Sequence, residues 1–245
     1  MASNLAGGGV CIGAHDACLL RVARLATDCS PLGGADSGII TAGIVTMTAS
    51  ADIEEGTVLE PKTGCGDIGF TVEQPSRTKR VNLTGDLLFH DDELMELLFG
   101  GSLIIGSGTS DFATDVIGWA EPDITDPAPD PVYIEVITRL SARGAGECST
   151  GGVAVPYAQG HIFGKARLTL GDETFENDVR NLSFTGVSTS NPALFNGPWN
   201  DWPGLTNGSP YIPNSPRVKV KYSREEYDAI ADLAGCGYLT LPAGS

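Results

Sequence analysis

The chain has little positive charge and lacks any long apolar run. Its 245 residues include 15 lysines and arginines against 31 aspartates and glutamates, for a formal net charge of −16. Because affinity for phosphate comes mainly from clustered basic side chains, such a surface disfavours nucleic-acid binding and suits solubility or the repulsion of DNA. No apolar run approaches the roughly 20 residues of a membrane helix, and the first residues lack the basic and apolar regions of a signal peptide. We therefore expect a soluble protein made in a cytoplasm, without membrane insertion.

Cysteine patterns typical of metal sites are also missing. The sequence holds six cysteines, Cys11, Cys18, Cys29, Cys65, Cys148 and Cys236. None forms a CxxC pair, and the N-terminal cluster of cysteines with His15 fits none of the usual zinc spacings. The sequence therefore predicts no metal site, and it predicts the reduced, partly buried thiols of a cytosolic protein.

Motifs of the common enzyme classes are absent as well. There is no GxSxG, no P-loop, no GxGxxG followed by a helix and no HExxH. The histidines are scattered, at His15, His90 and His161, in positions with ordinary structural explanations. The acidic pairs Asp91-Asp92 and Glu54-Glu55 are explained by helix capping and turn solvation. We expect no enzymatic activity, no catalytic residue and no cofactor.

The stretch from Val81 to Gly101, VNLTGDLLFHDDELMELLFGG, predicts a strand that runs directly into a helix. Apolar residues alternate with polar ones in its first half, so one face of the strand is expected to be buried. Acids at positions 91–93 suit a helix N-terminus, leucines then repeat at helical spacing, and Gly100 is a natural stop. A helix over 91–99 must pack on the edge or flank of a sheet.

Most of the remaining chain has the composition and periodicity of β-strands. Strands are predicted over 38–50, 68–73, 102–106, 116–120, 132–137, 161–170, 179–187 and 217–222, while 17–25 suits a first strand or a short helix. In the strand 161–170, one face is expected to carry Ile162, Ala166, Leu168 and Leu170. The pattern predicts a mainly β protein, a β-sandwich or barrel of two packed sheets with one flanking helix.

The segments between these strands are rich in turn-forming residues. Turns are predicted at 54–56 and, with basic residues, at 76–80. The segment Glu121–Pro131 holds four prolines and four acids, so it should be an exposed loop or a linker. The segment 224–245 is expected to hold one helical turn and a final extended piece.

A long loop over 191–216 contains two of the three tryptophans, Trp199 and Trp202. With Phe195, these rings either cover an open end of the core or form an exposed anchor for a neighbouring subunit or a sugar. The sequence leaves both interpretations open.

Three stretches taken in order carry a family resemblance: VNLTGDLLFHDDELMELLFGG, FENDVRNLSFTG and NPALFNGPWNDWP. Together they resemble the major tail tube proteins of long-tailed, siphovirus-like double-stranded DNA phages, of the type found in phages of actinobacteria. The resemblance implies a tail-tube β-sandwich domain over 38–205 with its flanking helix at 91–99. It leaves an N-terminal arm and first strand region over 1–37, and a C-terminal extension over 206–245 that completes the domain or contacts neighbouring subunits.

The resemblance also implies a function. Six copies of such a protein form a ring, and rings stack into a tube through which genome DNA passes without specific binding. The location is then the virion tail, after synthesis in the bacterial host cytoplasm. The partners are further copies together with tape measure, terminator and distal tail proteins. The acidic balance suits this role, since a negatively charged lumen lets DNA slide.

Candidate site residues follow from this resemblance. Seven basic residues lie in two segments without acids, 76–80 and 215–224, and we expect them to dock on acidic surface of the next subunit or ring. Loops over 51–65 and 144–155 are candidates for contacts between rings. The predicted interface residues are Arg77, Lys79, Arg80, Arg217, Lys219, Lys221, Glu54, Glu55, Trp199 and Trp202. The predicted lumen-facing acids are Glu173, Glu176 and Asp178.

Two other functions are compatible with the sequence. A tail terminator or another single-ring tail component can use the same fold, and it would stop at one ring. A carbohydrate-binding β-sandwich would use Trp199 and Trp202, and it would be a monomer that binds glycans.

Overall fold

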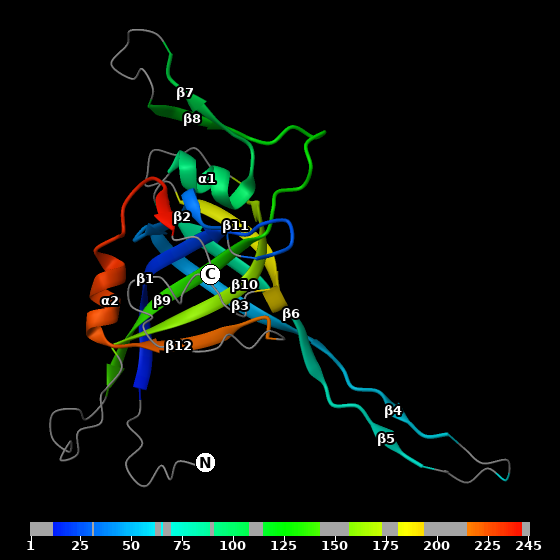
Figure 1. The fold of residues 1–245 in the computed structure, drawn as a ribbon. Coiled ribbons are helices and arrows are strands. Elements are labelled where there is room, and N and C mark those ends of the chain that lie inside the picture. Colours follow the sequence, from blue (N-terminus) through cyan, green and yellow to red (C-terminus); the bar gives the residue numbers. More distant parts are fainter. Residues whose placement is uncertain are drawn as a thin grey trace.

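The computed structural model describes residues 12–30, 32–61, 65, 70–88, 91–107, 115–142, 157–172, 181–193 and 215–241 (Figure 1). The described chain is mainly β, as the composition predicts. Its strands are β1 (Ile12–Arg24), β2 (Gly34–Thr41), β3 (Ile44–Glu54), β4 (Val58–Leu59), β5 (Val72–Glu73), β6 (Arg77–Leu87), β7 (Ser102–Ile105), β8 (Val116–Ala120), β9 (Val132–Ala142), β10 (Ala158–Leu170), β11 (Leu182–Thr189), β12 (Val218–Tyr222) and β13 (Leu239–Leu241). Its helices are α1 (Asp92–Phe99) and α2 (Arg224–Ala231).

Most of these strands form one antiparallel sheet. Its hydrogen-bonded order is β13-β2-β1-β9-β10-β11-β6-β3. β12 pairs with the first half of β10 and β11 with the second half, so β11 and β12 lie end to end along one edge of β10. Two further pairs, β4–β5 and β7–β8, form separate two-stranded hairpins.

The sheet curls until its two ends approach each other. β2 and β3 lie far apart in hydrogen-bonded order, yet only Ala42 and Gly43 connect them, and β1 contacts β3. This connection draws the β3 end of the sheet towards the β1–β2 end. The two halves therefore pack face to face as in a β-sandwich, with curvature approaching that of a barrel.

Two apolar clusters lie on opposite faces of this sheet. The first, inside the curl, joins side chains of seven strands to the buried face of α1. The second lies beneath β12 and α2 on the outer face, and includes Tyr133, Ile137, Tyr222, Tyr227 and Ile230. β9 serves both clusters, because Ile134 and Val136 belong to the first cluster while Tyr133 and Ile137 belong to the second. Burial on both faces explains the nearly continuous apolar run at 132–137.

The predicted unit of strand followed by helix is confirmed. β6 buries Val81, Leu83 and Leu87 on one face, as the alternation indicates. In α1, the Asp91 side chain accepts hydrogen bonds from the backbone N–H groups of residues 93 and 94, which caps the helix N-terminus. Gly100 ends the helix at φ +77°, a conformation that glycine adopts readily. The buried face of α1 consists of Leu94, Met95, Leu97, Leu98 and Phe99.

The C-terminal segment also belongs to the sheet. α2 is longer than the single turn expected from the sequence, and Ser223 and Glu226 form a reciprocal capping box at its start. After α2 the chain returns to pair β13 with β2. Between them, the backbone N–H of Gly237 donates to Asp91 at 3.0 Å and that of Tyr238 donates to Glu93, so this segment also holds the N-terminus of α1.

Two strand predictions near the N-terminus need revision. The segment 17–25, left open between strand and helix, lies almost entirely in β1. The single strand predicted over 38–50 is wrong, because the chain turns at Ala42 and Gly43 and divides into β2 and β3. The Thr41 hydroxyl oxygen accepts a hydrogen bond from Gly43 N at 3.1 Å, which stabilises this turn. The uniform β-forming composition on both sides concealed the break.

The face predicted for the strand 161–170 is confirmed for Ala166, Leu168 and Leu170 but wrong for Ile162. The register between β10 and β9 shifts between Phe163 and Ala166, which marks a β-bulge. Ile162 therefore packs in the outer cluster, whereas Phe163, Ala166 and Leu168 all pack in the inner one. An extra residue in a strand reverses the alternation beyond it, and alternation alone does not show where that residue lies.

The turns predicted at 54–56 and 76–80 are wrong as well. β3 pairs with β6 as far as Glu54 opposite Arg77, and the two chains continue side by side into β4 and β5. Gln74 N donates to Thr57 O at 3.1 Å along this extension. The backbones approach so closely that a Cβ at Gly56 would lie 1.6 Å from Gln74 O. These polar residues belong to an exposed two-stranded ribbon, which Figure 1 shows projecting from the body.

Candidate assembly surfaces

The longest projection is the two-stranded extension of β3 and β6, here called the arm, which comprises the described residues 53–61, 65 and 70–77. Its large apolar side chains are exposed: Ile53, Val58, Leu59, Phe70 and Val72. Scattered exposed apolar residues are ordinary, but a group on one projecting ribbon is a candidate surface for contact with another molecule. The arm includes Glu54 and Glu55, both exposed, from the predicted interface set.

A second projection lies beyond α1, where Figure 1 shows the hairpin β7–β8. Three isoleucines are exposed on it, at Ile104, Ile105 and Ile117. The hairpin is tied to the body by Trp119, whose indole N–H donates to Gly100 O at 2.7 Å. The segment after it, Glu121–Pro131, is a loop that is mostly exposed, as predicted, although its last residue, Pro131, is buried; we call it the acidic loop. The hairpin is thus held firmly at its base while its apolar side chains face solvent.

The sheet itself offers a third surface at β3. Among the strands that the structure describes, β3 pairs only with β6, so its outer edge carries backbone N–H and C=O groups with no strand beside them. This edge is eleven residues long. Long exposed edges readily pair with strands of other chains. The arm continues directly from this edge, so the two surfaces form one continuous region.

The structure brings the two predicted basic segments together. Arg77 and Arg217 line one hollow of about 350 Å³, here called the basic hollow, between the start of β6 and the residues before β12. Its complete lining is Ala51, Arg77, Thr78, Val81, Ser215, Pro216 and Arg217. The Ser188 hydroxyl donates to Pro216 O at 3.1 Å and fixes the approach to β12 beside β11. No periodicity in the sequence indicates this meeting of residues 140 positions apart.

The charges around the basic hollow are partly paired. Arg77 Nε lies 3.3 Å from Glu54 Oε2, and Arg80 Nε lies 2.6 Å from Asp52 Oδ2, in cross-strand ion pairs that are exposed and therefore weak. The side chains of Lys79, Lys219 and Lys221 are exposed. Burial, followed by the positive charges of Lys219 and Arg217, lowers the pKa of His161 below its usual value. The basic side chains of the two segments thus gather on one region of a protein whose net charge is strongly negative.

Several predicted residues lie outside the described part of the chain. These are Trp199 and Trp202, the acids Glu173, Glu176 and Asp178, and the loop 144–155. Their proposed roles stay predictions. The described cysteines, Cys18, Cys29, Cys65 and Cys236, are free thiols.

A buried polar cluster on the outer face was not predicted from the sequence. Arg21 and Glu135 are fully buried and form an ion pair. Tyr133 and Tyr222 both donate hydrogen bonds to the Glu135 carboxylate, the first at 3.1 Å. Burial, followed by repulsion from Glu135, raises the pKa of both tyrosines well above the usual range. Burial opposes the charge on Arg21, but Glu135 and the tyrosines outweigh it and raise the pKa of Arg21. The signal in the sequence that could have indicated this cluster is a single acid, Glu135, within the otherwise apolar run 132–137.

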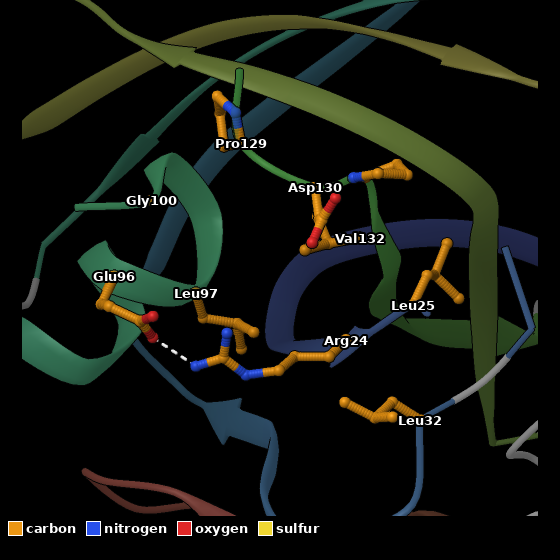
Figure 2. A pocket seen from close by; sticks show the side chains of 10 residues that line it. Arg24, Leu25, Leu32, Glu96, Leu97, Gly100, Pro129, Asp130 and Val132 are labelled. Carbon is orange, nitrogen blue, oxygen red and sulfur yellow. Dashed lines mark hydrogen bonds and ion pairs between the residues drawn. The ribbon is translucent and has the colours of Figure 1, made fainter. Parts of the chain in front are cut away.

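A cavity of about 240 Å³ lies beside α1, between Arg24, the helix and the end of the acidic loop (Figure 2). Figure 2 shows Arg24 and Glu96 pointing towards each other, joined by an ion pair. Tyr238 donates to the same carboxylate and accepts from Arg24 at 2.7 Å. Burial, followed by the hydrogen bond to Glu96, raises the pKa of Tyr238. These groups satisfy one another, so the cavity wall joins α1 to β1 and the C-terminal segment.

Within the described residues, no group of three or more His, Cys, Asp or Glu side chains is placed to hold a metal ion. No helix in those residues is long and apolar enough to cross a membrane. No protein-family model matches the chain, and no curated protein is similar to it. The resemblance to tail tube proteins therefore stays a prediction.

Proposed function

We propose that the chain is a structural subunit that assembles with copies of itself into stacked rings, forming the tube of a phage tail through which DNA passes. The observation that carries the proposal is the placement of exposed apolar side chains on two projecting hairpins. Of the thirteen large apolar side chains that are exposed in the described chain, five lie on the arm and four lie on β7–β8 and the acidic loop. Exposed apolar side chains on projections are typical of surfaces that become buried against other subunits in an assembly.

The energetic argument favours association through these projections. Burying one large apolar side chain contributes about 1.5–3 kcal/mol, so a few of the five on the arm can offset the entropy of association. The unpaired edge of β3 adds backbone hydrogen bonds if a strand of another copy lies beside it. A contact between different patches on each copy closes into a ring when the rotation permits, and stacking then uses the remaining surfaces.

Charge and fold support the tail tube over other assemblies. A formal net charge of −16 keeps phosphate from binding along a conduit and leaves DNA free to move. The mainly β fold, with α1 packed against the inner cluster, supports the proposal because the family resemblance implies a β-sandwich with a flanking helix. In this proposal the virion tail is the location, and the tape measure, terminator and distal tail proteins are the partners at the ends of the tube.

The test is negative-stain microscopy of the purified protein, together with its mass in solution over a concentration series. We expect hollow tubes or stacked rings, with a mass that rises with concentration. Single rings that never stack would support a terminator instead. A monomer at every concentration, also in the presence of a distal tail complex as assembly initiator, would contradict the proposal. Glycan binding by that monomer would favour the carbohydrate-binding alternative.

A further inference from the structure

The basic hollow combines apolar and cationic groups in one lining. Ala51, Val81 and Pro216 supply the apolar part, and Val81 and Pro216 are buried. Arg77 and Arg217 supply the positive charge. Arg77 is paired with Glu54, whereas Arg217 forms no ion pair with any carboxylate in the described residues. A hollow of this kind fits an apolar side chain that has carboxylates on either side of it.

The acidic loop presents that pattern on its turn 123–126. Ile124 is 99% exposed, and the exposed carboxylates of Asp123 and Asp126 flank it. The turn is well ordered, because Asp123 Oδ1 accepts from Thr125 N at 3.0 Å and Asp126 Oδ2 accepts from Asp123 N at 2.8 Å. The hydrogen bonds from Thr125 also hold the pKa of Asp123 below its usual value, so this carboxylate stays charged. An ordered turn loses little conformational freedom on binding.

The two surfaces lie on different sides of the molecule. In Figure 1 the connection from β8 to β9 lies beside α1 and β7–β8 at the upper end of the body, while β12 and the start of β6 lie towards its lower end. A loop on one side does not reach a hollow on the other within the same copy. A contact between them therefore joins two copies head to tail, and such a contact can repeat.

We propose that the acidic loop of one copy docks into the basic hollow of a second copy, with Ile124 against the apolar lining and its flanking aspartates beside Arg77 and Arg217. This inference rests on the proposed function, because it names one of the contacts by which the copies assemble. Lys219 and Lys221, both exposed on β12, extend the positive surface towards the approaching loop. Two acidic loops repel each other, and so do two basic hollows, so the charges favour the contact of a loop with a hollow over contacts between like surfaces.

The experiment uses two variants of the full chain. The hollow variant carries Arg77→Glu and Arg217→Glu. The loop variant carries Asp123→Asn, Ile124→Ser and Asp126→Asn, in which the amide oxygens can still accept the hydrogen bonds of the turn. Arg139→Glu on β9 and Leu233→Ser just after α2, both at exposed positions outside the two surfaces, serve as matched controls. Circular dichroism and thermal unfolding check that every variant folds.

We expect each variant alone to raise the concentration needed for assembly about tenfold or more, and the controls to leave it unchanged. In a mixture of the two variants, the hollow variant still has an intact loop and the loop variant still has an intact hollow. One kind of docking contact therefore remains, between a copy of the first variant and a copy of the second. The mixture should then form a discrete complex with twice the mass of the unit that each variant forms alone, whether that unit is a single copy or a ring. Tubes from either variant at the wild-type concentration, or a mixture without this doubling, would overturn the docking contact and leave the proposed function standing. Failure of the wild-type chain to assemble would instead count against the proposed function.

Discussion

Arg21 and Glu135 place two opposite charges completely out of water, an arrangement that is stable only when both charges are well satisfied. Tyr133 and Tyr222 complete the satisfaction of the carboxylate. Gly160 gives this cluster its space, because a Cβ at that position would lie 1.9 Å from Glu135 Oε1 and 2.7 Å from the Tyr222 ring. The outer face of the sheet is therefore fixed by polar geometry as well as by apolar packing.

We expect Gly160→Ala to destabilise the protein by about 2 kcal/mol or more, because the added methyl group forces the buried carboxylate or the tyrosine ring to move. Gly235→Ala is the matched control, since a Cβ there meets nothing within 4 Å. The control should change the free energy of unfolding by less than about 0.5 kcal/mol. Urea unfolding measures both. Equal effects of the two substitutions would show that the cluster tolerates movement.

The same cluster predicts a loss of stability at alkaline pH. A tyrosine ionises near pH 10 in the unfolded chain, whereas burial and Glu135 raise the folded-state pKa of Tyr133 and Tyr222. The stabilisation is complete below pH 10 and falls as the pH rises, because the unfolded chain then releases protons that the folded chain retains. Each tyrosine contributes at most about 1.4 kcal/mol per pH unit.

Tyr222→Phe tests this linkage. The variant loses the hydrogen bond to Glu135 and is less stable at pH 8, but its free energy of unfolding should fall less steeply between pH 10 and pH 11.5. Urea titrations across this range give the slope. A slope equal to that of the wild-type protein would contradict the assignment of the alkaline transition to Tyr222.

At the scale of elements, α1 shows which local signals are sufficient. Its cap, its apolar spacing and its stop at Gly100 all lie within ten residues, so the sequence predicts it correctly. The break between β2 and β3 and the bulge in β10 depend on which strands lie alongside, and that information is spread over the whole chain. The arm was missed for the same reason, since exposed ribbons and turns share polar residues and differ only in pairing.

The cap of α1 has a second role that separates it from the cap of α2. Asp91 caps α1 and also accepts from Gly237 N, while Ser223 caps only α2. We expect Asp91→Ala to reduce the free energy of unfolding by about 2–4 kcal/mol, against about 1 kcal/mol for Ser223→Ala. Thermal or urea unfolding compares the two variants. A loss of the same size in both would mean that the C-terminal segment does not depend on α1.

The candidate surfaces were predictable only in part. Composition alone located the basic segments and the exposed acidic loop, because clusters of charge and proline are read directly from the chain. That Arg77 and Arg217 share one hollow depends on the end-to-end arrangement of β11 and β12 along β10, which no local pattern encodes. The burial of Arg21 was not predicted, because a single arginine in a strand usually indicates a solvent-exposed face of that strand.

At the scale of the whole molecule, the arm should matter for assembly and not for folding. Val58→Ser, Leu59→Ser and Val72→Ser replace exposed side chains, so the combined variant should unfold with nearly the free energy of the wild-type monomer. Its assembly should require a much higher concentration, because the apolar area buried between copies is lost. Sedimentation at matched concentrations measures this difference. Unchanged tubes would show that the arm lies outside the contacts.

The place of β1 in the sheet has a consequence for synthesis. β1 pairs with β9 along most of its length, with Leu20 opposite Val136. At about 5–20 residues per second, a ribosome needs roughly 5–20 s to make the chain from the end of β1 to the start of β9. The arm emerges during this interval, before the sheet that carries it can close. Each nascent chain therefore exposes the apolar side chains of the arm before its sheet has folded. Neighbouring nascent chains on the same polysome are then close enough to associate prematurely, and this association has to be prevented.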